Sequence, residues 1–287
     1  MNFSHFLITQ FNLRSFPLSN NSEYESWVIW TRKRIELFRQ YCLPSVINQS
    51  SKSFTWLLYF DAETPEEFNG FIEEVKTNSF INICYCEGFK GFKNAYIEEV
   101  KIRLPRVAKW VITTRIDNDD CLHRDAIKII QENFTERHKF LISLASGYIL
   151  NIADRTMSHY FYPMSPFISI IENTGVEISG VFEKGHTEWN SLRLFVLREI
   201  WLDYFKKGAR LSRFILKKPL WIQIFHGGNV SNSFYRGLPV LKNKDLSEFS
   251  IPFPNEILPF KYILKYPDYV TWKRYFKSFI TKIILKK

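Results

Sequence analysis

The chain has 287 residues, of which 46% are hydrophobic and 17% aromatic, and it carries a formal net charge of +10. This composition excludes a disordered or fibrous protein and allows a large α/β core with an anionic partner. The four cysteines have no Cys-x-x-Cys spacing, no run of about 18 apolar residues occurs, and no secretory signal pattern is present. We expect a cytoplasmic protein, either soluble or peripheral at the inner face of the membrane.

Strand-like and helical runs alternate through the first half of the chain. The patterns predict strands at residues 5–11, 54–60, 80–86 and 110–116, and helices at residues 26–41, 65–76 and 93–107. Such alternation favours an α/β fold with a Rossmann-like, mostly parallel sheet flanked by helices. Ligands of these sheets bind at the carboxyl ends of the strands, where Asp61 and Asp117 are both expected.

The pattern becomes less regular beyond residue 140, and the last residues are strongly basic. Shorter runs occupy residues 140–149, 152–162 and 176–182, followed by a helical stretch at 193–206. We assign residues 1–240 to one domain and 241–287 to a C-terminal extension. Within it, residues 270–287 place aromatic and aliphatic side chains at three- and four-residue spacing among lysines. This amphipathic helix would lie on anionic lipid or dock on the domain.

Three carboxylates follow directly on an apolar strand: Asp117, Asp119 and Asp120. Because side chains alternate along a strand, Arg115, Asp117 and Asp119 can converge beyond its end. Clustered carboxylates repel one another unless a cation offsets their negative charge. Their hard oxygen atoms suit Mg²⁺ or Mn²⁺, which usually keep coordination sites for phosphate oxygens. The alternative is that Asp119 or Asp120 caps a helix predicted at residues 123–134.

Four segments occur in a fixed order: LITQFN (7–12), WLLYFD (56–61), TRIDNDD (114–120) and WIQIFHGGN (221–229). With them the chain resembles, over roughly residues 3–238, the rhamnosyltransferase family of bacterial glycosyltransferases, which have a GT-A-like fold. The resemblance implies a nucleoside diphosphate sugar donor, such as dTDP-rhamnose, and a saccharide or lipid-linked acceptor in surface polysaccharide synthesis. It also implies a Mn²⁺ or Mg²⁺ ion held by an Asp-x-Asp element.

The resemblance assigns metal and sugar contacts to four residues. Asp119 is the first choice for coordinating the metal, followed by Asp120, while Asp117 would contact the donor sugar or ribose. His226 would complete the metal shell or contact the diphosphate, and the glycines after it would allow close approach of a ligand. Alternatively, His226 is a hydrogen-bonded structural histidine after a buried strand.

A nucleotide pocket is expected beside the first two strands. Polar residues near the end of the first strand would line it: Thr9, Gln10, Asn12 and Arg14. Asp61 would accept a hydrogen bond from a pyrimidine N3–H, or it caps the turn before Pro65. Arg115 would bind phosphate or pair with its acidic neighbours, and Lys93 would do likewise.

An inverting transfer requires a base that deprotonates the acceptor hydroxyl. Among the residues downstream of the acid cluster we favour Glu172, then His186, with Glu183 and Glu188 as further candidates. Two other functions fit the clustered acids and the positive charge: a metal-dependent phosphohydrolase or nuclease, and a non-enzymatic basic protein that binds membrane or nucleic acid. We favour the transferase, without a nucleic-acid partner; binding of sugar nucleotides would separate these functions.

Overall fold

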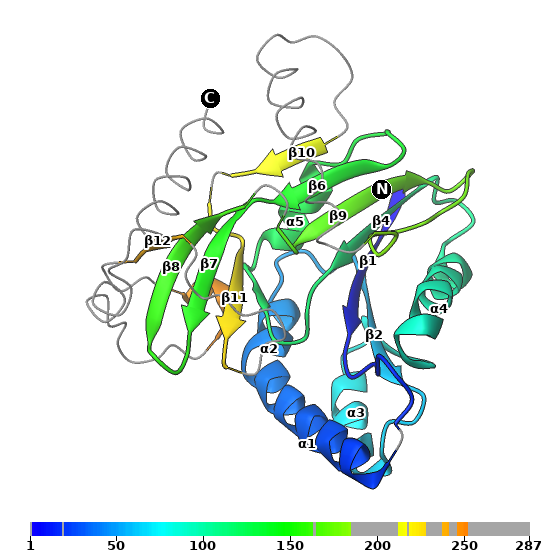
Figure 1. Cartoon of the computed structure of the whole chain (residues 1–287). Helices are drawn as coiled ribbons and strands as arrows, with labels where there is room; N and C mark the ends of the chain where they lie inside the picture. The colour runs from blue at the N-terminus through cyan, green and yellow to red at the C-terminus, as the bar shows by residue number, and fades with distance from the viewer. Residues whose placement is uncertain are drawn as a thin grey trace.

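The computed structural model describes residues 2–18, 20–162, 165–184, 212–216, 218–227, 237–240 and 246–251. The helices expected at 193–206 and 270–287, and His186, lie outside these residues. Two sheets organise the part that is described (Figure 1). Within that part, no helix combines the length and the apolar character needed to cross a membrane.

The larger sheet has seven strands in the order β10-β6-β9-β4-β1-β2-β3. Its parallel centre comprises β1 (Phe3–Gln10), β2 (Thr55–Asp61), β3 (Ile81–Cys86) and β4 (Trp110–Arg115). The rest comprises β6 (Phe140–Leu144), β9 (Ile168–Asn173) and β10 (Ser212–Ile215). Strand β9 runs antiparallel to both β4 and β6, whereas β10 is parallel to β6. The expected mostly parallel sheet is therefore confirmed.

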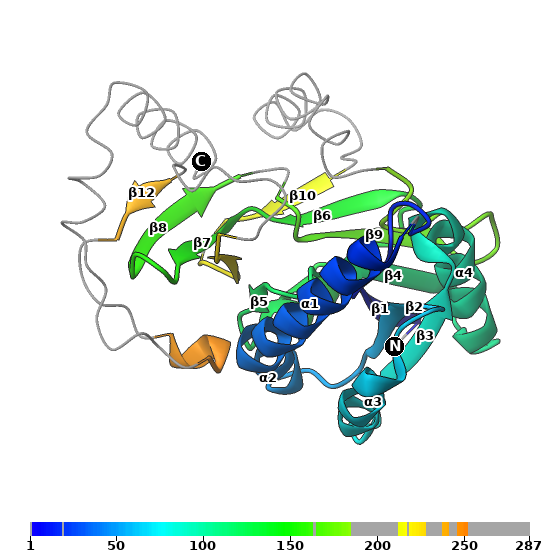
Figure 2. The same ribbon diagram turned by 60° about the horizontal axis from the view of Figure 1, so that its bottom comes forward.

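Helices cover both faces of this sheet (Figure 2). Their bounds are α1 (Asn21–Leu37), the π-helix η1 (Phe38–Cys42), α2 (Leu43–Ile47), the 3-10 helix η2 (Glu66–Phe68), α3 (Asn69–Lys76), α4 (Gly88–Arg103) and α5 (Ala126–Glu132). Side chains of α1, α3 and α5 pack on one face with Leu7 and Trp56, and those of α4 pack on the other with Ile8 and Leu57. Alternate residues of the buried strands thus enter opposite cores.

The helix expected at residues 123–134 begins later and is shorter. Asp125 occupies its N-cap position, and no side chain caps it there. Neither Asp119 nor Asp120 is a cap, so that interpretation of the acid cluster is wrong.

A second sheet, which the sequence patterns did not indicate, lies beside the first. It has the order β12-β8-β7-β11-β5, with β5 (Cys121–Leu122), β7 (Ser146–Asn151), β8 (Thr156–Phe161), β11 (Trp221–Phe225) and β12 (Leu238–Pro239). The apolar run 140–149 is not one strand, because β6 and β7 belong to different sheets. The run 176–182 forms no strand. Residues 246–251, which include the 3-10 helix η4 (Ser247–Phe249), bury apolar side chains against this sheet.

Trp221 packs and hydrogen-bonds β11 against the neighbouring segments of the chain. The ring is 1% exposed, stacks on Phe167 with centroids 4.7 Å apart, and its Nε1 donates to the carbonyl oxygen of Leu144 at 2.6 Å. Gly147 precedes Tyr148, which pairs with Ile222 on β11, and a Cβ on that glycine would stand 2.0 Å from Trp221 Cδ2. The indole therefore occupies the space that any side chain at position 147 would need.

His5 is a buried titratable group in the centre of the larger sheet. Its Nε2 lies 2.7 Å from Thr114 Oγ1, which is in turn 2.6 Å from Ser169 Oγ. Burial lowers the pKa of His5 to about 3. A histidine in an unfolded chain has a pKa near 6.5. Between these values the unfolded chain binds a proton that the folded protein excludes.

We therefore expect the free energy of unfolding to fall by up to about 1.4 kcal/mol for each pH unit below 6.5, through the His5 contribution alone. The contribution is complete above pH 6.5 and is lost as the pH falls toward 3. Urea unfolding at pH 7.5, 6.5, 5.8 and 5.0 measures it. His5→Gln should flatten this dependence, whereas His138→Gln, at an exposed histidine, should not. Equal slopes in the wild type and His5→Gln would contradict the assignment.

Candidate active site at the carboxyl ends of the parallel strands

Asp119 is the centre of a buried polar group that three distant parts of the chain build. It follows β4, is 6% exposed, and accepts a charged hydrogen bond from Nη1 of Arg34 on α1. Nε2 of His226, the residue after β11, lies 3.0 Å from the same Oδ2 atom. Burial acts to raise the pKa of Asp119, but the hydrogen bond from His226 and the charge of Arg34 outweigh it and hold this pKa below its usual value. Asp119 is therefore an ionised carboxylate with two partners.

Asp120 connects the acidic loop to the second sheet. Its Oδ1 accepts the backbone N–H of Ile224 on β11 at 3.0 Å, and the residue is 2% exposed. Burial, and then the charges of Asp119 and Asp117, raise the pKa of Asp120 well above its usual value. The predicted metal ligand thus has one oxygen in a backbone contact that positions β11.

Asp117 is the accessible acid of the cluster. Its side chain is 45% exposed and pairs with Nη2 of Arg115 at 3.0 Å. The Arg115 guanidinium lies 5.0 Å from the centre of the Phe182 ring, and its buried Nε has no partner among the described residues. The predicted pairing of Arg115 with an acidic neighbour is confirmed.

These pairs change the electrostatic argument made from sequence. Arg34 offsets Asp119 and Arg115 offsets Asp117, so the repulsion among the acids does not by itself require a metal ion. Arg34 was not predicted as a site residue, because it is far from the acidic motif in the sequence. The sequence nevertheless marks it, since a charged residue stands on the apolar face of a helix. The buried residues of that face in α1 are Trp27, Val28, Thr31, Arg34 and Ile35.

The region predicted to bind the nucleotide, beside the first two strands, contains an ion pair at the end of β2. Asp61 is fully buried and accepts hydrogen bonds from Arg14 Nη2 at 2.9 Å, Arg14 N at 3.1 Å and Glu63 N at 3.1 Å. The backbone N–H of Asp61 donates to Asn12 Oδ1 at 3.0 Å. Asp61 therefore caps its turn, as the alternative interpretation predicted. The half-buried Arg14 also pairs with Glu63 at 2.7 Å.

Two predicted donor contacts lie elsewhere. Thr9 is fully buried and its Oγ1 accepts the indole N–H of Trp56 at 3.0 Å, so its expected place in the pocket is wrong. Lys93, on α4, lines a separate cavity of about 550 Å³ together with His138, Lys139 and Glu183. No residue of the acid cluster lines that cavity. The half-buried Gln10 ends β1 and remains a predicted contact.

Glu172 does not lie where a base for this site is needed. It is fully buried, and its carboxylate accepts hydrogen bonds from Ser179 N, Ser179 Oγ and Gly180 N at 2.8–3.0 Å. It pairs in register with Val111, six residues before Asp117, which is about 20 Å along a strand. Glu172 thus holds a loop at the opposite end of β4, and its predicted catalytic role is not supported.

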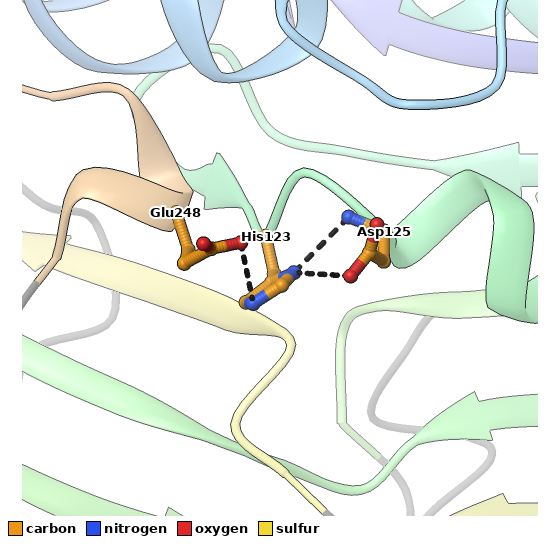
Figure 3. Close-up of side chains that lie close together, drawn as sticks. All are labelled: His123, Asp125 and Glu248. Carbon is orange, nitrogen blue, oxygen red and sulfur yellow. Dashed lines mark hydrogen bonds and ion pairs between the residues drawn. The ribbon is translucent and has the colours of Figure 1, made fainter.

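A second group of potential ligands, His123, Asp125 and Glu248, fastens residues 246–251 to the domain (Figure 3). His123 Nδ1 accepts the backbone N–H of Asp125 at 3.0 Å, and Nε2 lies 3.7 Å from Glu248. Lys218 pairs with Asp125 at 2.9 Å and Arg124 with Glu248 at 3.6 Å. Each carboxylate already has a cation beside it. The arrangement therefore fits an ion-pair network that holds η4 in place.

The polar group around Asp119 contains two ligand atoms that suit a divalent cation. Asp119 Oδ2 and His226 Nε2 are 3.0 Å apart, the separation of two neighbouring ligands that each lie about 2.1 Å from an octahedral ion. A carboxylate with an imidazole suits Mn²⁺. Gly227 follows with a φ of 80°, a conformation that favours glycine, and a Cβ there would meet nothing within 4 Å. The residues fit the ion, but Arg34 already occupies the shared oxygen.

Comparison with known proteins gives one sequence match. A family model described as "Putative rhamnosyl transferase" matches residues 14–186, which is more than half of the chain. This range includes the acid cluster, Arg34 and Asp61 and ends before His226. No match is found among curated proteins.

Solved structures show weak similarity to this chain. TarS residues 1–349 from S. aureus, in complex with UDP, align over 78% of this chain and 61% of that one, with 13% identity and a TM-score of 0.40. A second S. aureus TarS structure aligns over 78% and 37%, with 11% identity and a TM-score of 0.37. The 4-diphosphocytidyl-2C-methyl-D-erythritol synthase from Anaerococcus prevotii aligns over 78% and 87%, with 13% identity and a TM-score of 0.28. This chain spans less than two thirds of either TarS chain.

Proposed function

The chain belongs to the rhamnosyl transferase family, and we propose that it transfers a sugar from a nucleoside diphosphate donor to a hydroxyl group of a saccharide or lipid-linked acceptor. The observation that carries the proposal is that Arg34, Asp119 and His226 meet beyond the carboxyl ends of parallel strands, with the Arg115–Asp117 pair just before Asp119 in the sequence. This edge is where sheets of this kind bind their ligands.

The chemistry of this group suits departure of a diphosphate, which builds negative charge as the sugar leaves. Guanidinium groups bind phosphate oxygens with paired hydrogen bonds. Arg115 lies beside the accessible Asp117, and its buried Nε has no hydrogen-bond partner in the described part of the chain. The exposed Asp117 carboxylate would accept hydroxyl groups of the donor sugar or ribose. Asp119 and His226 would hold Mn²⁺ or Mg²⁺, which when bound would neutralise charge on the diphosphate.

The family relationship also suggests the donor, the stereochemistry of transfer and the acceptor. We propose dTDP-rhamnose as the donor, inversion at the transferred carbon, and an acceptor in surface polysaccharide synthesis. His186 stays our candidate for the base that deprotonates the acceptor. The basic segment 270–287 would keep the protein at the inner face of the cell membrane, close to lipid-linked acceptors.

Thermal unfolding with a panel of nucleoside diphosphate sugars, with and without Mn²⁺, tests donor binding. A donor present at 100 times its Kd stabilises the folded state by about 2.7 kcal/mol, which raises Tm by roughly 5 °C in a protein of this size. We expect dTDP-rhamnose to give this shift in the wild type and to release dTDP when an acceptor extract is added.

One arginine variant and one lysine variant test where the donor binds. Arg115→Gln should lose most of the thermal shift, because it removes the guanidinium beside Asp117. Lys93→Gln should keep it, because Lys93 lines a different cavity. If no sugar nucleotide stabilises the wild type, and phosphate esters are hydrolysed instead, the protein is a phosphohydrolase and the proposal is wrong.

A further inference from the structure

Arg34 and a divalent cation would require the same oxygen atom. The Arg34 guanidinium donates to Asp119 Oδ2, and His226 Nε2 lies 3.0 Å from that oxygen. All three side chains are about nine-tenths buried. A guanidinium does not lose its proton in a protein, so its charge is present whenever it occupies this position. A cation that approached Oδ2 would meet this charge at close range, with little water to screen it.

Two further contacts would hold Arg34 beside Asp119 if their hydrogen bond broke. Its Nη1 lies 3.3 Å from Asn118 Oδ1, and its guanidinium carbon lies 4.9 Å from the centre of the Trp30 ring. The Asn118 side chain is itself fixed by a hydrogen bond to the carbonyl oxygen of Phe11. A small rotation of Arg34 would therefore free Oδ2 while its charge stayed beside the site. From there it could bind an oxygen of an arriving diphosphate.

We propose that Arg34 is an internal counter-ion that competes with the divalent cation for Asp119, so that the ion binds weakly to the donor-free protein and tightly once a diphosphate draws Arg34 away. This inference rests on the proposed function, because it takes Asp119 and His226 as the metal ligands beside the donor. Arg34 acts here as a positioning residue: it links occupancy of the metal site to arrival of the donor. Such a link would keep the site free of metal while no donor is bound.

Binding of Mn²⁺ alone to the full chain tests the competition. Free Mn²⁺ is measured by electron paramagnetic resonance while the ion is titrated into the protein without nucleotide. We expect Arg34→Gln to bind Mn²⁺ at least about tenfold more tightly than the wild type, a size typical of coupling between sites. Arg34→Lys, which keeps a charge, should lie within about threefold of the wild type.

Two controls make the result specific to Asp119. Lys33→Gln removes an exposed positive charge one residue away and should leave Mn²⁺ affinity unchanged, which separates direct competition from a general change in charge. The double variant Arg34→Gln/Asp119→Asn should lose the tight binding. Circular dichroism at each Mn²⁺ concentration confirms that every variant is folded.

A measurement on the wild type does not depend on the variants folding. Addition of Mg²⁺ together with dTDP should shift the Arg34 Nε–H resonance, assigned by its absence in Arg34→Lys. Mn²⁺ affinity in Arg34→Gln that is no higher than in the wild type, or saturation with Mg²⁺ and dTDP that leaves this resonance in place, overturns the inference. Failure of the proposed function would look different: no nucleotide would bind, whereas the Mn²⁺ affinities would still show whether Arg34 competes.

Discussion

Replacing Asp119 by asparagine is expected to lower the rate of sugar transfer by about a thousandfold, measured as nucleotide release in the presence of acceptor. The amide keeps the shape of the side chain but removes the negative charge that would hold a metal ion beside the diphosphate. Loss of one such preorganised electrostatic contact typically costs on the order of 10²–10³ in rate. The same change leaves the guanidinium of Arg34, which is 7% exposed, without its counter-charge. We expect it to destabilise the fold by about 3 kcal/mol.

The double variant Arg34→Gln/Asp119→Asn separates the two effects. Removing both charges leaves no uncompensated charge in this buried position, so most of the lost stability should return. Transfer should not return. Urea unfolding and nucleotide release on the same samples provide the two readouts. An active double variant would show that Asp119 serves only to offset Arg34.

Replacing Gly147 by alanine is expected to be the most damaging single methyl addition in the second sheet. The new Cβ would stand 2.0 Å from Cδ2 and 2.2 Å from Cε2 of Trp221. The indole cannot withdraw, because it stacks on Phe167 and donates to the Leu144 carbonyl. Overpacking of this kind costs about 3 kcal/mol, at the upper end of the usual range. Urea unfolding, followed by tryptophan fluorescence, measures the loss.

Gly70→Ala is the matched control for this substitution. Gly70 is exposed on α3, and a Cβ there would meet nothing within 4 Å. Alanine should raise stability by about 0.5–1 kcal/mol, because it restricts the unfolded chain and favours helix. If Gly147→Ala unfolded at the same urea concentration as Gly70→Ala, the ring of Trp221 would have room that the structure does not show.

The parallel centre of the larger sheet was predictable because its strands are buried and are separated by helices. The strands β1 to β4 differ from their expected bounds by two residues or fewer. The second sheet was not predictable from these patterns. Its strand β7 continues the apolar run of β6, and only contacts with distant strands decide that the chain changes sheets near Ala145. The strand β9 was not predicted, because its partners β4 and β6 both run antiparallel to it and lie far from it in the sequence.

The site was predicted in part, for reasons that differ from residue to residue. Asp119 and His226 were both expected at strand ends, and the structure brings them together. Thr9 was expected in the pocket because it lies near a strand end, but its side chain points into the core. Arg34 escaped notice because its role depends on how α1 packs across the sheet. Local sequence can mark the end of a strand, but it does not tell which helix will reach that end.

The contact between Asp120 and β11 has a consequence for how the protein is made. Its two partners are 104 residues apart in the chain, and Asp119 and His226 are 107 residues apart. During synthesis the parallel strands β1 to β4 leave the ribosome long before β11 does. Until Ile224 has emerged, Asp120 lacks the backbone N–H that it binds in the folded protein. Until His226 has emerged, Asp119 can pair with Arg34 but not with His226. The nascent chain can thus pair its four parallel strands early, whereas the group of side chains around Asp119 is completed late.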